Sequence, residues 1–192
     1  MKMKRLFISI IVIILNLHTL FSQDKQGNIE VFFRDAITES VPVFKTKTDT
    51  ICIATIKENN QDENWHDIEI LEKSKKRYKV IITSFNEFPN VVVEGWVDRE
   101  QCGVWLHGKL DVIHELWTVN IYSKPGSSHP KEILIDRNYG GFVEFDNGKA
   151  VPVIDYKYFK GKYWIKTVIT KNGKKVVGWT TDYCPNVYDS CC

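Results

Sequence analysis

Two segments of the chain repeat one pattern, and this repeat constrains the fold more than any other feature. "VVVEGWVDREQC" runs from Val91 to Cys102, and "KVVGWTTDYC" runs from Lys175 to Cys184. In each segment an apolar run reaches Gly-Trp, and a short polar stretch then ends on a cysteine. The two tryptophans, Trp96 and Trp179, are 83 residues apart. In a chain of 192 residues this repeat predicts two small domains in tandem.

The segments before each Gly-Trp pair also occur in the same order. They are short, rich in Val, Ile, Thr and aromatic residues, and bounded by Gly, Asn, Asp and Ser, which is typical of small antiparallel β units. Asn172-Gly173, between two apolar runs, is a strong hairpin signal. The glycine before each tryptophan predicts either a bend in the strand backbone or a close approach to a neighbouring strand. We expect an all-β chain of two small barrels, at residues 23–108 and 109–192.

The second of these units resembles the bacterial SH3-like domain. The resemblance rests on "VNIYSKPGSS" (Val119–Ser128), on Tyr-Trp-x-Lys at Tyr163–Lys166 and on "GKKVVGWTTDY" (Gly173–Tyr183). The first unit matches less well, and Tyr78 stands where the family has a mid-strand tryptophan. The resemblance implies two SH3-like barrels. It also implies a binding role, because such domains in exported bacterial proteins often bind cell-wall peptides, glycans or other proteins.

The beginning of the chain has the pattern of a secretory signal peptide. Lys2, Lys4 and Arg5 precede an apolar run at Leu6–Leu17, and Ser22 supplies a small residue before Gln23. The run is shorter than the ~20 residues of a membrane-spanning helix. Cleavage after residue 22 would leave 23 basic and 24 acidic side chains, a net charge of −1. We therefore expect a periplasmic or secreted protein without a membrane span, and this charge gives no argument for nucleic-acid binding.

Five cysteines would remain in the exported chain, where disulfides are favoured. Cys102 and Cys184 end their units in equivalent positions, so each is expected to tether one barrel. We predict a Cys52–Cys102 bridge in the first unit, and a bridge from Cys184 to Cys191 or Cys192 in the second. The cysteine left over from the terminal pair is then a free thiol or a link to a partner.

No pattern in the sequence points to an enzyme, a metal site or a cofactor. Cys102 has histidines nearby in the sequence, but it follows a strand and the acidic stretch Asp98–Glu100, which does not favour a reactive thiolate. There is no Cys-x-x-Cys pair, no His-x-x-x-His pair, no Gly-x-Ser-x-Gly and no phosphate-binding glycine loop. The chain is interpreted as a non-enzymatic binding protein.

The candidate ligand surface lies in the aromatic stretch "DYKYFKGKYW" of the second unit. On an alternating strand Tyr156 and Tyr158 share one face, while Phe159 takes the other. Rings exposed beside lysines would suit sugar faces or the acidic groups of a peptide; alternatively, the rings complete a thin core and an interdomain seam. The candidate ligand-binding residues are Tyr122, Tyr156, Tyr158, Trp164, Lys160 and Lys162.

The segment between the units, Gly103–Asn120, is too apolar for a flexible linker. It is predicted to pack between the barrels, with Leu110, Val112 and Ile113 among its buried residues. The favoured function is recognition of a cell-wall peptide or glycan. The alternative is a protein-interaction module, such as an immunity-type inhibitor of an exported toxin or wall hydrolase. An acidic patch on the first unit would favour this alternative; its residues are Asp62, Glu63, Asp67 and Glu69.

Overall fold

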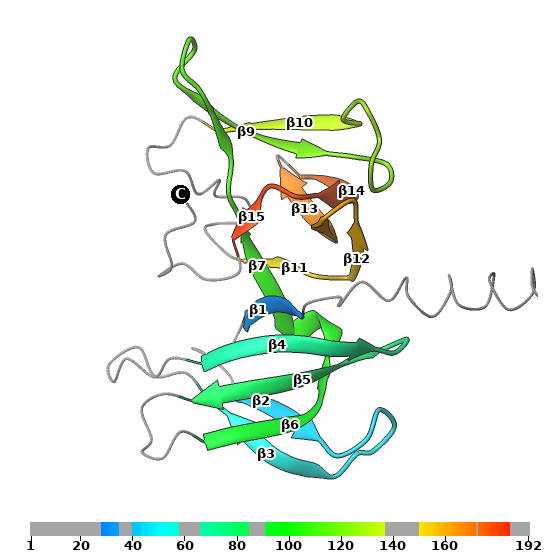
Figure 1. Cartoon of the computed structure of the whole chain (residues 1–192). Coiled ribbons are helices and arrows are strands. Elements are labelled where there is room, and N and C mark those ends of the chain that lie inside the picture. Colours follow the sequence, from blue (N-terminus) through cyan, green and yellow to red (C-terminus); the bar gives the residue numbers. More distant parts are fainter. Residues whose placement is uncertain are drawn as a thin grey trace, which may run out of the picture.

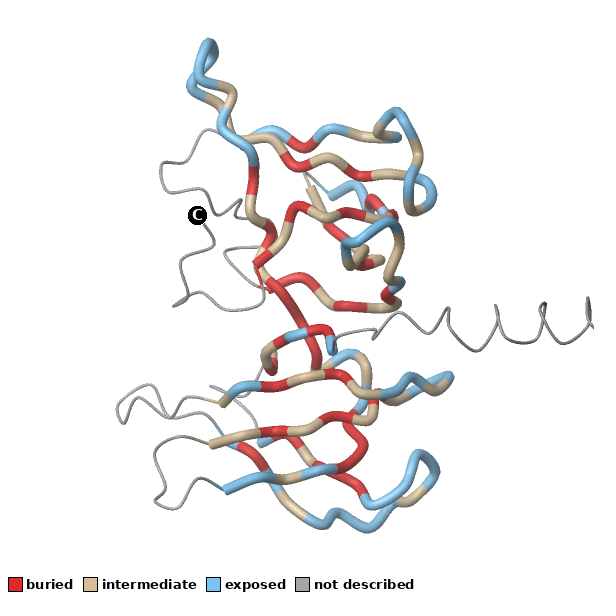
Figure 2. The backbone as a smooth tube through the Cα atoms, viewed as in Figure 1, coloured by how far each residue is buried: buried red, intermediate tan, exposed pale blue. Residues whose placement is uncertain are grey.

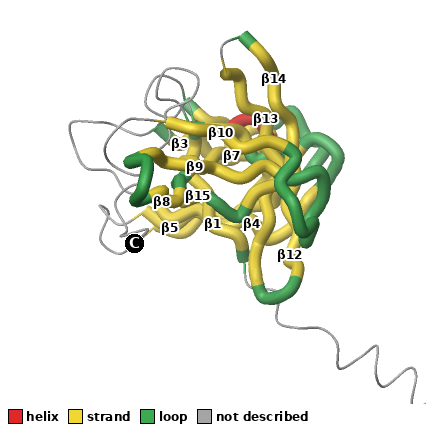
Figure 3. Tube along the Cα trace, turned by 90° about the horizontal axis from the view of Figure 1, so that it is seen from above, coloured by secondary structure: helices red, strands yellow, loops and turns green. Residues whose placement is uncertain are grey.

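The structure is a computed structural model that describes residues 28–34, 40–57, 66–84, 91–136, 150–171 and 173–184. Within these ranges the chain is all-β, as expected, with one short 3-10 helix, η1 (Arg99–Gln101). Figure 3 shows how strands dominate the trace. The strands form several antiparallel sheets, and none of the sheets closes into a barrel in the described part of the chain.

A hairpin followed by a three-stranded meander makes up the first half of the chain. β2 pairs with β3, and β4, β5 and β6 pair in sequence. β1 adds to the free side of β4. We refer to β1–β6 as the first unit. Its strands are β1 (Ile29–Phe33), β2 (Val41–Phe44), β3 (Cys52–Ile56), β4 (His66–Lys73), β5 (Arg77–Ser84) and β6 (Val91–Asp98).

The second half repeats this order. β9 pairs with β10 as a hairpin, and β12, β13 and β14 form a meander. We refer to β8–β15 as the second unit. Its strands are β8 (Lys109–Asp111), β9 (Leu116–Ile121), β10 (Glu132–Asp136), β11 (Val151–Pro152), β12 (Asp155–Phe159), β13 (Lys162–Lys171), β14 (Lys174–Thr180) and β15 (Tyr183–Cys184). The two units lie at opposite ends of the molecule in Figure 1.

The Gly-Trp pair of the first unit marks the place where the hairpin crosses the meander. Trp96 in β6 pairs with Phe44 in β2. A Cβ atom on Gly95 would collide with the Val43 side chain and lie 2.9 Å from the Phe44 carbonyl oxygen. Only glycine leaves room for this crossing, as the sequence predicted.

The second Gly-Trp pair makes the same crossing. Trp179 exchanges two backbone hydrogen bonds with Tyr122, with N···O distances of 2.7 and 2.8 Å. A Cβ atom on Gly178 would collide with Ile121 and lie 2.8 Å from the Tyr122 carbonyl oxygen. The sequence repeat therefore encodes one backbone crossing that is used twice.

β7 (Cys102–Leu106) joins the two units. It pairs with β1 of the first unit and with β11 and β15 of the second. Cys102, Val104 and Leu106 are buried, and Figure 2 shows this buried stretch running between the units. The apolar connector is thus a shared strand rather than a flexible linker.

The later part of the connector differs from the prediction. Leu110, Val112 and Ile113 are 49%, 77% and 87% exposed, because Leu110 lies in β8, and Val112 and Ile113 lie at the tip of the β8–β9 hairpin and not between the units. The Asp111 carboxylate organises this turn, since its Oδ1 atom accepts hydrogen bonds from the backbone N–H groups of Ile113 and His114. The tip projects away from the body of the molecule (Figure 1).

Polar contacts tie the first unit to the segment around β11 and β12. The Tyr78 hydroxyl donates to the Val153 carbonyl at 2.9 Å, and the Lys73 ammonium lies 2.8 Å from the Asp155 carboxylate. The Tyr78 ring is 5.8 Å from the ring of Tyr156. These contacts and β7 together make a continuous seam between the units.

Candidate functional site

The strand register sorts the candidate residues of the second unit onto two faces of the β12–β13–β14 sheet. Tyr156 lies opposite Ile165, and Tyr158 lies opposite Tyr163. Because directly paired residues share a face, Tyr156 and Tyr158 lie on one face together. Ile165 on that face is fully buried, so this is the core side of the sheet.

Tyr156 lies on this core side, whereas the predicted ligand surface requires exposed rings. Its side chain is only 8% exposed, and the Lys73 ammonium lies 5.0 Å from its ring centre. Burial raises the pKa of its hydroxyl. Tyr158, at the end of the same strand, is half-buried and meets Tyr163 edge-on, with ring centres 5.1 Å apart. The reading of these rings as core and seam is correct for Tyr156.

The opposite face carries two of the predicted residues in contact. The Tyr122 and Trp164 rings lie 5.2 Å apart in an edge-to-face arrangement. Lys166 is on the same face two residues beyond Trp164, and it lies opposite Trp179. All four side chains are half-buried. We call Tyr122, Trp164, Lys166 and Trp179 the outer face of the second unit.

Lysines surround one margin of the outer face, at the turn between β12 and β13. Lys157 and Lys160 lie 5.9 and 5.5 Å from the centre of the Phe159 ring. This ring packs over Gly126, where a Cβ atom would collide with it. Lys162, opposite Phe159, is exposed. The predicted Lys160 and Lys162 thus lie at the margin of the outer face. The contact between Phe159 and Gly126 holds the loop after β9 against the β12–β13 turn.

The first unit has an equivalent face, which the sequence reading did not identify. Phe44 and Lys79 both lie opposite Trp96, just as Tyr122 and Lys166 lie opposite Trp179. Arg77, two residues before Lys79, therefore takes the position of Trp164. Within this chain, Arg77 rather than Tyr78 therefore corresponds to Trp164.

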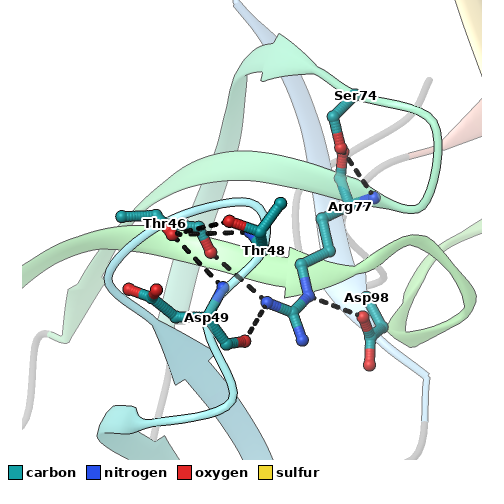
Figure 4. A network of polar contacts seen from close by, with 6 residues as sticks. All are labelled: Thr46, Thr48, Asp49, Ser74, Arg77 and Asp98. Atoms are coloured by element: carbon teal, nitrogen blue, oxygen red, sulfur yellow. Dashed lines mark hydrogen bonds and ion pairs between the residues drawn. The ribbon is translucent and has the colours of Figure 1, made fainter.

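Arg77 closes the equivalent face of the first unit (Figure 4). Its guanidinium carbon lies 3.7 Å from the centre of the Phe44 ring. Its Nε atom donates to the Asp98 carboxylate at 2.9 Å, and its Nη1 atom donates to the carbonyl oxygens of Thr46 and Asp49. The Arg77 guanidinium is therefore held by three kinds of contact: an ion pair with Asp98, a cation–π contact with Phe44 and hydrogen bonds to two backbone carbonyls.

A cavity of about 450 Å³ lies where the two units meet. Its most buried polar group is Asp182, which accepts hydrogen bonds from the backbone and side-chain amides of Asn120 and lies 3.2 Å from the Lys109 ammonium. Burial raises the pKa of the Tyr183 hydroxyl. Only Lys162 among its residues was a predicted site residue. The lining residues are Asn28, Ile29, Glu30, Lys109, Lys162, Tyr163, Thr181, Asp182 and Tyr183.

The predicted Cys52–Cys102 bridge is absent, because both thiols are free. Cys52 lies in β3 and Cys102 in β7, at opposite ends of the strand path from β7 to β3. A side-chain hydrogen bond with Thr55 lowers the pKa of the exposed Cys52 thiol, whereas burial raises the pKa of Cys102. Cys102 and Cys184 occupy equivalent positions in the repeat, but this equivalence did not indicate that Cys102 forms a disulfide.

Cys184 is buried in β15 and disulfide-bonded. Its expected partners, Cys191 and Cys192, lie outside the described residues, as do the signal-peptide residues and Asp62 and Glu63 of the acidic patch. These expectations stay predictions.

Across the described ranges, no group of three or more His, Cys, Asp or Glu side chains is placed to hold a metal ion. In the same ranges no helix is long and apolar enough to span a membrane. Comparisons with protein-family models, curated proteins and solved structures find no match to this chain. The functional argument therefore rests on the outer face and on the sequence.

Proposed function

We propose that the chain is an exported, non-enzymatic binding module built from two tandem SH3-like units, and that it recognises a cell-wall peptide or glycan through the outer face of the second unit. The observation that carries this proposal is the half-exposed Tyr122–Trp164 pair beside lysines. The repeated hairpin, meander and Gly-Trp crossing support the tandem units. The n-region and apolar run at the start of the chain support export to the periplasm or the exterior.

The arrangement of the rings suits a binding surface. Aromatic side chains present a large apolar face at a small cost in side-chain entropy, and an edge-to-face pair is stabilised by roughly 0.5–1.5 kcal/mol beyond its burial. Trp164 and Lys166 project from β13, and Tyr122 is bonded through its backbone to Trp179 in the neighbouring strand β14. A surface on paired strands needs little reordering to bind, which favours affinity.

The test is co-sedimentation of the chain from Gln23 to Cys192 with purified cell-wall sacculi. Saturable pelleting that is weakened by up to about tenfold in Trp164→Ala or Tyr122→Ala is expected, because an aromatic contact contributes roughly 0.5–1.5 kcal/mol beyond its burial. Phe32→Ala is the matched control, since Phe32 stacks on Trp105 at 5.7 Å in a different part of the molecule. Circular dichroism confirms that each variant is folded.

A protein-interaction module, such as an immunity-type inhibitor, is the second candidate. The exposed Leu110, Val112 and Ile113 at the β8–β9 tip favour it, because exposed apolar groups of this kind mark interaction sites. A folded chain that does not pellet with sacculi would exclude the wall-binding proposal and favour this one.

A further inference from the structure

We propose that the outer face of the second unit selects an anionic ligand, in which carboxylates lie beside the ring or peptide plane that contacts Tyr122 and Trp164. This inference rests on the proposed function and adds the charge of the ligand to it. The first unit, which has the same backbone and an equivalent face, provides the internal comparison.

In the first unit each cation of the equivalent face has its own carboxylate. The Arg77 guanidinium lies 2.9 Å from Asp98, and the Lys79 ammonium lies 2.5 Å from Glu94. Both carboxylates come from β6, the strand next to β5. Both cations of this face are therefore paired with carboxylates of the chain itself, without any ligand.

In the second unit both of these carboxylates are missing from the corresponding positions. Counted from the tryptophan of each Gly-Trp pair, Glu94 corresponds to Val177, and Asp98 corresponds to Thr181. Lys166 keeps the position of Lys79. The cation of the face is thus retained while its internal partner is replaced by an apolar or neutral side chain.

Among the residues that the structure describes, no other carboxylate of the second unit is within ion-pair distance of Lys162 or Lys166, and three of these carboxylates are paired with other lysines. Their lysine partners are Lys174 for Glu132 at 3.7 Å, Lys73 for Asp155 at 2.8 Å and Lys109 for Asp182 at 3.2 Å. Lys162 and Lys166 are therefore open to an external carboxylate.

The aromatic rings of the two faces also differ: the ring of the first unit is covered by a cation of the chain, whereas those of the second unit are half-exposed. In the first unit the Arg77 guanidinium covers Phe44 and is itself held by the loop that follows β2. In the second unit Trp164 replaces Arg77, so that two half-exposed rings stand beside lysines. In the first unit, the cation that covers the ring (Arg77) and the carboxylates that pair with the cations (Asp98 and Glu94) all come from the chain itself. The second unit leaves the complementary places open for a ligand, and we expect one such site per chain.

The test compares polymers that differ only in charge. Retention of the chain from Gln23 to Cys192 is measured by affinity electrophoresis in gels containing polygalacturonate or its fully methyl-esterified form. We expect the acidic polymer to bind at least about fivefold more tightly, since two exposed ion pairs each add modestly to the affinity. Equal retention in the two gels, or none in either, would overturn the inference.

Variants locate the effect on the outer face. The double substitution Lys162→Gln/Lys166→Gln should abolish the preference for the acidic polymer. The matched pair Lys75→Gln/Lys76→Gln, on the exposed β4–β5 turn, should preserve it. Val177→Glu should weaken binding of the acidic polymer while leaving both lysines in place, because it restores the internal carboxylate of the first unit. An unchanged preference in Val177→Glu and in the double variant would place the binding elsewhere and contradict the inference.

Sacculi separate this inference from the proposed function. Untreated sacculi are compared with sacculi whose carboxyl groups have been converted to neutral amides. Pelleting only with untreated sacculi agrees with both proposals. Equal pelleting with both preparations would keep the wall-binding function and overturn the charge selectivity. Failure to pellet with either, together with a preference for polygalacturonate, would overturn the wall as the ligand and keep the anion site.

Discussion

Gly178 has neighbours that leave no room for a side chain. The Ile121 side chain and the Tyr122 carbonyl oxygen occupy the space of a Cβ atom. The carbonyl cannot rotate away, because Tyr122 is bonded to Trp179 in both directions. The crossing between the hairpin and the meander thus depends on one missing side chain.

Gly178→Ala should destabilise the protein by about 2–3 kcal/mol, since forcing atoms into a packed site costs roughly that much. Gly161→Ala is the control: its φ of 77° is unfavourable for alanine, but nothing lies within 4 Å of the new Cβ atom, so about 1 kcal/mol is expected. Urea unfolding measures both. Equal losses would show that the close approach at Gly178 is not limiting.

Cys52 and Cys102 should differ sharply in reactivity. The Cys52 thiol is exposed and its pKa is lowered, whereas Cys102 is fully buried. Iodoacetamide at pH 7 should therefore alkylate Cys52 in the native protein and Cys102 only after denaturation. Peptide mass spectrometry assigns the sites. Thr55→Ala should slow the labelling of Cys52, because it removes the hydrogen bond that lowers the pKa; labelling of native Cys102 would contradict the burial.

At the scale of the element, the two meanders share a backbone but stabilise their outer surfaces in different ways. β5 places Arg77 on Phe44, and the Arg77 side chain fixes the loop between β2 and β3. β13 places Trp164 at the same register position, where it contacts Tyr122. One strand position is thus used to close a surface in the first unit and to build a candidate site in the second.

Arg77→Ala should loosen the loop between β2 and β3 and destabilise the protein by about 1–2 kcal/mol, since a partly buried cation–π contact and its hydrogen bonds are lost. Faster amide hydrogen exchange at Thr48 and Asp49 should accompany the loss. Lys79→Ala, which removes a more exposed ion pair, should cost less than about 0.5 kcal/mol. Unchanged exchange in the loop of Arg77→Ala would contradict this role.

At the scale of the whole molecule, β7 makes the two units one folding unit. Trp105 in β7 stacks on Phe32 of the first unit and lies opposite Cys184 of the second. We expect the wild-type chain to melt in one transition. Trp105→Ala should uncouple the units and give two transitions in calorimetry, because it removes the ring stack that holds β7 against the first unit; a single unchanged transition would contradict this.

The seam also predicts a loss of stability at alkaline pH. Burial raises the pKa of Tyr78 above its ordinary value near 10, so the folded state holds the proton that the unfolded state releases. The stabilising effect is complete below pH 10 and is lost as the pH rises further. Urea unfolding at pH 8 to 11 should show this decline, and ultraviolet titration should show Tyr78 ionising late. Tyr78→Phe should make the decline shallower, while the buried hydroxyls of Tyr183 and Tyr156 still contribute to it; an equally steep decline would exclude Tyr78 as a cause.

Local patterns in the sequence determined the all-β class, the order of strands, the need for glycine before each tryptophan and the shared face of Tyr156 and Tyr158. These follow from strand alternation and backbone sterics, which act over a few residues. Only the tertiary structure decided that Cys52 and Cys102 lie apart, that Tyr156 is buried and that Arg77 takes the place of Trp164. It also decided that Val112 and Ile113 are exposed. Each of these depends on register or on partners tens of residues away, and such long-range pairings leave no periodic trace in a single sequence.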